Sequence, residues 1–199
     1  QGDAYLLLGA IYRNNRSYSQ SYHYLKKALQ IRRAIGDSNR VASVFINLGI
    51  NYLDECKYDS AISAVTYAAD IVERCPRPEQ DVLGSAYLLL SNIFDEYLEP
   101  DEALKYAKKS LLAYSATNQN PLIAKSTYAL ANRFLNVGKR DSALYYYSQT
   151  FDLVKASDHS SVFLSDIWTN QGIAHFQLGD YERALGCFNE AEAILEKTG

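Results

Sequence analysis

The sequence predicts an all-α fold of five stacked helix-turn-helix units. A pattern of small residues recurs every 40–42 positions along all 199 residues, and apolar residues within each period follow helical spacing. The chain also has only ten Gly and four Pro. Turn-rich β folds need more of both, so the composition favours helices.

Small residues mark three positions in every unit. The first set recurs at intervals of 40, 42, 40 and 41 residues: Gly9, Gly49, Ser91, Ala131 and Gly172. Twelve residues after each of these comes the second set: Ser21, Ala61, Ala103, Ala143 and Ala184. Seven residues further comes the third set: Ala28, Ala68, Ser110, Thr150 and Ala191. Large side chains would hold crossing helices apart, so we expect the two helices of each unit to cross at these residues.

Apolar and aromatic residues complete each helix. Three residues after the first small residue, four units carry an aromatic: Tyr12, Tyr52, Phe94 and Phe134. The fifth unit carries His175 there, which we expect to be a hydrogen-bonded packing residue. Pro100 suits the first turn of a helix. The pattern predicts one domain, 1–199, with repeats at about 2–41, 42–83, 84–123, 124–164 and 165–199.

The chain resembles the tetratricopeptide-repeat family in these residues and in the segment Tyr24-Leu25-Lys26-Lys27-Ala28-Leu29-Gln30-Ile31. The usual unit of that family has about 34 residues. The longer unit here is similar to the branch seen in kinesin light chains and bacterial peptide-sensing regulators. The resemblance implies a right-handed α-α superhelix (solenoid) of five units, whose first helices line a concave groove that binds a peptide or protein segment.

Asparagine is frequent on the predicted exposed face of the first helices, a face that also includes Ile46 and Leu88. An asparagine amide both donates and accepts, so it can pair with the backbone of an extended peptide. The alternative is that these are polar groups on a solvated face. The predicted ligand-binding residues of the concave groove are Arg13, Asn47, Asn92, Lys125, Asn132, Asn136 and Asn170.

Other functions find little support in the sequence. The net charge of −3 gives no general attraction to nucleic acid, and the basic residues Lys26, Lys27, Arg32 and Arg33 are expected to lie on a solvated outer face. No apolar run is long enough to span a membrane. Three widely spaced cysteines indicate neither a disulfide framework nor a metal site. Ser157-Asp158-His159 contains triad residue types, but adjacent residues in a loop favour helix capping over catalysis.

The sequence therefore predicts a protein- or peptide-binding interaction domain without enzymatic activity, cofactor or metal. Because Met is absent, we interpret the chain as a segment of a longer protein. The resemblance then implies that this segment is the sensory or scaffolding part of a bacterial regulator. The alternative function is a structural scaffold that self-associates through its convex face or its terminal repeat, the latter giving a homodimer. The compartment stays open between cytoplasm and periplasm.

Overall fold

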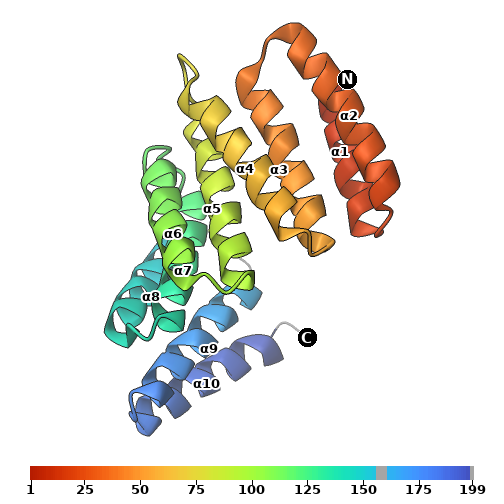
Figure 1. Ribbon diagram of the computed structural model, residues 1–199. Coiled ribbons are helices and arrows are strands. Elements are labelled where there is room, and N and C mark those ends of the chain that lie inside the picture. The colour runs from red at the N-terminus through yellow and green to blue at the C-terminus, as the bar shows by residue number, and fades with distance from the viewer. Residues whose placement is uncertain (156–160, 198–199) are drawn as a thin grey trace. The chain divides into compact units, whose positions relative to one another are not determined.

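The computed structural model describes residues 1–155 and 161–197, and these form ten helices without a strand (Figure 1). The tripeptide Ser157-Asp158-His159 lies outside the described residues. No helix within the described part is long and apolar enough to cross a membrane. The helices are α1 (Gly2–Asn14), α2 (Tyr18–Ile35), α3 (Ser38–Asp54), α4 (Tyr58–Glu73), α5 (Gln80–Glu96), α6 (Pro100–Ser115), α7 (Asn120–Asn136), α8 (Arg140–Lys155), α9 (Ser161–Gln177) and α10 (Tyr181–Glu196).

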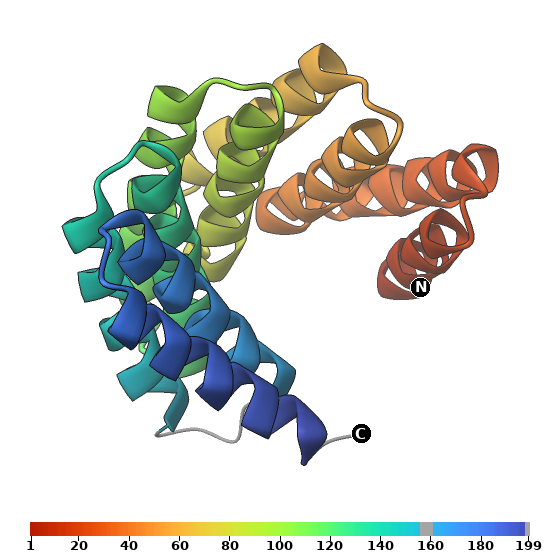
Figure 2. The ribbon, with the colours of Figure 1, turned by 90° about the horizontal axis from the view of Figure 1, so that it is seen from below.

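The helices fall into two compact units, Gln1–Glu99 with α1 to α5 and Pro100–Gly199 with α6 to α10. Consecutive helices within each unit run antiparallel (Figures 1 and 2). The boundary falls inside the predicted third repeat, between α5 and α6. The single domain 1–199 therefore stays a prediction, and each unit is described by itself.

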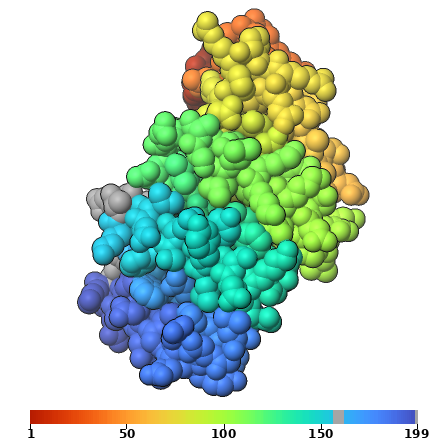
Figure 3. Space-filling model, turned by 90° about the vertical axis from the view of Figure 1, so that its left-hand side faces the viewer, coloured from red at the N-terminus to blue at the C-terminus, as the bar shows by residue number. Residues whose placement is uncertain are grey.

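Both units are built from the predicted helix pairs. In the first unit, α1 pairs with α2 and α3 with α4, while α3 also packs on α1 and α2, and α5 on α3 and α4. In the second unit, α7 pairs with α8 and α9 with α10, while α6 packs on α7, and α9 on α7 and α8. These helices follow one another over the surface in Figure 3, from green (α6) to blue (α10). The predicted all-α helical-repeat class is confirmed.

The small residues lie where the paired helices cross, as predicted. All fifteen are buried. A Cβ at Gly49 would lie 2.2 Å from Cγ2 of Val65, so α3 and α4 approach as closely as their backbones allow. In the first pair, the Ser21 hydroxyl donates to the Gly9 carbonyl oxygen at 2.7 Å, a direct bond across the crossing of α1 and α2.

The turn inside each repeat uses a left-handed residue at one constant position. Seven residues after the first small residue, φ is positive in all five repeats: Arg16, Cys56, Leu98, Gly138 and Gly179. Glycine adopts this conformation without steric cost, whereas a side chain makes it about 1–2 kcal/mol less favourable. The turn geometry is thus imposed by the helix pair even where the sequence supplies no glycine.

Three expectations about exposure are wrong. Arg32 is buried rather than solvated, because its guanidinium forms an ion pair with Asp3 beside the small residue Gly2. The side-chain hydrogen bond from Arg32 also holds the pKa of the Asp3 carboxyl below its ordinary value. Ile46 and Leu88 are likewise buried.

His175 is half-buried, as expected for a packing residue, but its Nδ1 has no hydrogen-bond partner among the described residues. This nitrogen lies 3.8 Å from a carboxylate oxygen of Asp180, beyond hydrogen-bond distance.

A methyl group at Gly49 tests the helix crossing. We expect Gly49→Ala to lower the free energy of unfolding by about 1–3 kcal/mol, because the new Cβ collides with Val65. Gly186→Ala is the matched control, since a Cβ there meets nothing within 4 Å. Alanine in this helix interior should raise stability by about 1 kcal/mol. Urea unfolding measures both variants, and equal effects would disprove the close crossing.

Candidate functional site

The exposed side of the first helices carries a shallow pocket between α3 and α5. Its volume is about 270 Å³. The lining residues are Ser43, Ile46, Asn47, Asp81, Val82 and Ser85. Ile46 and Val82 give it an apolar part, while Asn47 and Asp81 provide an amide and a carboxylate. This combination suits a segment that presents both backbone hydrogen-bonding groups and an apolar side chain.

A polar network connects this pocket to α1. The Arg13 guanidinium donates to Oδ1 of Asn47 at 3.5 Å and lies 3.8 Å from a carboxylate oxygen of Asp54. The Asn47 amide nitrogen donates to the Ser43 carbonyl oxygen at 3.0 Å. Arg13 and Asp54 also line a neighbouring pocket of about 570 Å³. Two predicted site residues, Arg13 and Asn47, are therefore brought together, and both are already held by other groups of the protein.

In the second unit, Asn132 and Asn170 meet in a network with two tyrosines. The Tyr147 hydroxyl donates to Oδ1 of Asn132 at 2.6 Å. The Asn170 amide nitrogen lies 2.6 Å from the Tyr128 hydroxyl oxygen, to which it donates, and 3.4 Å from Oδ1 of Asn132. Burial raises the pKa of Tyr128 above its ordinary value, although the hydrogen bonds from the two asparagines oppose this shift. The two half-buried asparagines thus orient two tyrosine hydroxyl groups, and Tyr147 is itself fully buried.

The other predicted residues lie on α5 and α7. Asn92 is half-buried on α5, and Lys125 and Asn136 are exposed on α7. The sequence-based set omitted Asp81 and Val82, which line the α3–α5 pocket. Both lie about one helical turn before Ser85 on the same helix, so helical spacing carried the signal that could have found them.

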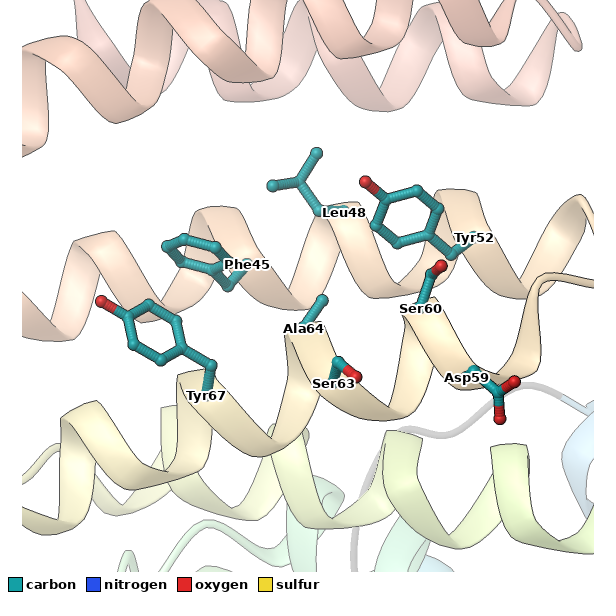
Figure 4. Close-up of a pocket in the computed structure, with 8 residues that line it drawn as sticks. All are labelled: Phe45, Leu48, Tyr52, Asp59, Ser60, Ser63, Ala64 and Tyr67. Atoms are coloured by element: carbon teal, nitrogen blue, oxygen red, sulfur yellow. The ribbon is translucent and has the colours of Figure 1, made fainter.

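A second pocket lies on the other side of α3, between α3 and α4 (Figure 4). Its volume is about 490 Å³. Phe45, Leu48 and Tyr52 reach it from α3, and Asp59, Ser60, Ser63, Ala64 and Tyr67 reach it from α4. The sequence analysis did not predict this pocket.

Clusters of metal-ligating residues do not occur in the part of the chain that the structure describes. None of its His, Cys, Asp and Glu side chains form a group of three or more that could hold a metal ion. The three cysteines are free thiols. The α3–α5 and α3–α4 pockets offer hydrogen-bonding groups, carboxylates and aromatic rings.

Comparison with known proteins identifies the repeats. A family model described as a tetratricopeptide repeat matches residues 1–74, and another with the same description matches residues 165–197. Protein KINESIN LIGHT CHAIN-RELATED 3 of Arabidopsis thaliana is 20% identical over 196 residues, which are 97% of this chain and 30% of that relative. The chain spans about a third of the length of the curated relatives that it matches.

Solved structures share the fold. The crystal structure of BtubC (BKLC) from P. vanneervenii is similar with a TM-score of 0.91 and 16% identity, covering 98% of this chain and 80% of that one. The apo form of RapI is similar with a TM-score of 0.85 and 17% identity, covering 99% and 71%. At such identities the likeness shows the fold and not the ligand.

Removing the Asn132 amide tests whether it supports the buried Tyr147 hydroxyl. We expect Asn132→Ala to lower the free energy of unfolding by about 1–3 kcal/mol, because that hydroxyl loses its acceptor. Tyr147→Phe removes the donor as well, so the double variant should recover most of the loss. The exposed Lys125→Ala is the control, expected within about 0.5 kcal/mol of the parent. Strictly additive losses in thermal unfolding would contradict the bond.

Proposed function

Because the chain belongs to the tetratricopeptide-repeat family, we propose that it binds a peptide or protein segment along the exposed faces of its first helices. The family and the fold are those of helical-repeat scaffolds with a protein-interaction role. The single observation that carries the location is the pocket between α3 and α5 with Asn47 on its wall. In the second unit, we propose a contact surface around Asn132 and Asn170, which lie hydrogen-bonded to each other on α7 and α9.

Asn47 is suited to contact a peptide backbone. Its amide has two N–H donors and two acceptor positions, and the contacts to Ser43 and Arg13 use one of each. One donor and one acceptor position therefore stay available to an extended chain. The same contacts fix the orientation of the amide, which lowers the entropy lost when a ligand binds.

We extend the proposal to a sensory or scaffolding segment of a larger regulatory protein. The relative named above is about three times longer than this chain, which supports a segment that works beside other parts. RapI, which is similar in fold, has been crystallised in a form described as apo. The description implies that RapI binds a ligand. Regulation by a bound peptide is the function we infer from these likenesses.

Peptide selection tests the groove. A random-peptide phage library panned on the parent chain supplies the ligands. Asn47→Ala should weaken the selected peptides roughly twofold to tenfold, the loss of one hydrogen bond. Val82→Arg should weaken them more, because it fills the α3–α5 pocket. Gln30→Ala, on an exposed part of α2, is the control and should leave Kd unchanged. Equal affinity for all three variants would place the binding site elsewhere.

Self-association through the terminal repeat is the second candidate function. On α10, Leu185 is 62% exposed and Leu195 is 49% exposed. Leu195 occupies the repeat position of Val72, which is fully buried in the second repeat. Exposed apolar side chains at positions that are elsewhere buried are typical of a face that another helix covers. A second copy of the chain could supply that helix.

Sedimentation analysis separates this candidate from peptide binding. If the face forms a dimer, the parent should be a dimer at micromolar concentration, and Leu185→Lys should make it a monomer by placing a charge in the interface. The exposed Leu112→Lys on α6 is the matched control and should keep the parent's mass. A parent that is monomeric throughout would exclude the homodimer.

A further inference from the structure

The pocket between α3 and α4 exists because one aromatic ring is missing from the repeat pattern. Fifteen residues after the first small residue, the five repeats carry Tyr24, Ala64, Tyr106, Tyr146 and Cys187. Three of the five units thus place a tyrosine where the second repeat has only a methyl group. Ala64 lines the pocket of about 490 Å³.

The tyrosines show what fits at this position. The Tyr24 ring stacks on Tyr12 with centroids 5.2 Å apart and an interplanar angle of 4°. The Tyr146 ring stacks on Phe134 at 5.3 Å and 7°. Tyr52 is the equivalent of Tyr12 and Phe134 in the second repeat. Its ring lies in the pocket wall (Figure 4). It meets the Tyr22 ring of α2 in a tilted contact at 5.5 Å, but no ring of its own repeat stacks on it as Tyr24 stacks on Tyr12.

The remaining walls define the shape of the pocket. Tyr67 packs against Phe45 in a T-shaped contact at 4.7 Å and bounds one end. Tyr52 and Ser60 bound the other end, and Ala64 lies between them (Figure 4). The volume lies in the range of about 300–1,000 Å³ that is typical of ligand sites. The space is therefore large enough for an aromatic side chain together with adjoining backbone.

The charges around the pocket favour a cation next to the ring. In the first repeat, the Lys27 ammonium lies 5.4 Å from the Tyr5 ring and 5.5 Å from the Tyr24 ring. Tyr67 takes the position of Lys27 in the second repeat, so that cation is absent there. Asp59, which lines the pocket, forms no ion pair with any described residue. A cation near the occupant's ring would meet both aromatic faces and this carboxylate.

We propose that this pocket is a docking site for a Tyr or Phe side chain of a partner protein, carried on a segment with a neighbouring Lys or Arg. The incoming ring takes the place that Tyr24 and Tyr146 hold in their own repeats and stacks on Tyr52. The site lies on a different side of α3 from the α3–α5 pocket. The chain can therefore bind one segment by backbone hydrogen bonds in the α3–α5 pocket and another by ring stacking in the α3–α4 pocket.

Ala64→Tyr tests the proposal, because it fills the pocket with the side chain that three other repeats carry at this position. The variant should fold, because the repeat pattern accepts tyrosine at this position, and thermal unfolding checks this. The first probe is p-cresol, the tyrosine side chain alone. In the parent, its addition should shift the NMR signals of Leu48, Tyr52 and Ala64. In Ala64→Tyr the shifts of Leu48 and Tyr52 should vanish, whereas Ala34→Tyr on an exposed part of α2 should keep all three.

The second probe is the random-peptide library. Peptides that bind this pocket should lose affinity roughly tenfold or more on Ala64→Tyr but keep it on Val82→Arg, and should be enriched in Tyr or Phe near Lys or Arg. The absence of p-cresol shifts in the parent, their persistence in Ala64→Tyr, or a library without such peptides would each overturn the proposal. Loss of peptides on Val82→Arg alone would support the α3–α5 groove and overturn this second site.

Discussion

The backbone-to-side-chain contact at the crossing of paired helices is the constraint on which the rest of the structure depends. At Gly49 even one methyl group would collide with Val65, so larger side chains must point away from the crossing. They can point either toward the neighbouring helix pair or along the outer faces. Both pockets of α3 follow from this division: Asn47 and Phe45 leave the same helix on different sides of Gly49.

The period and the helix pairs could be predicted because small residues are unambiguous at close crossings. Fifteen positions in five segments carry the same restriction on volume, and all fifteen are buried. Exposure of larger residues was harder to predict. Arginine is usually a surface residue, so Arg32 was expected to be exposed. It is buried because its charge is paired with Asp3, 29 residues away in the sequence. Helical spacing within one repeat contains no information about such a partner.

The candidate site shows the same limit. Asparagines on the exposed faces were identified from residue type, and two pairs of predicted residues do meet: Arg13 with Asn47, and Asn132 with Asn170. The hydrogen bonds from Asn47 to Ser43 and from Tyr147 to Asn132 could not be predicted from residue type. Several donors and acceptors lie near each amide, and only the folded structure shows which of them it pairs with. Direct comparison of repeat positions would have found the α3–α4 pocket, since Ala64 stands where three repeats have tyrosine.

The repeats depart from their common pattern in two ways: in some positions the surrounding structure compensates for the changed residue, and in others it leaves a space. Leu98 departs from the glycine seen at Gly138, and the helix pair simply holds it in the left-handed conformation. Ala64 departs differently, because the loss of a ring leaves a space. Tyr67 lies one turn further along α4 and packs against Phe45. It does not fill the space left at Ala64, and the pocket stays open beside Tyr52. The Tyr52 ring has a tilted contact with Tyr22 of the preceding repeat but no stacked ring from its own repeat, so it gains buried area and ring stacking when another ring binds. The uncompensated position is thus the one at which binding, rather than folding, completes the packing.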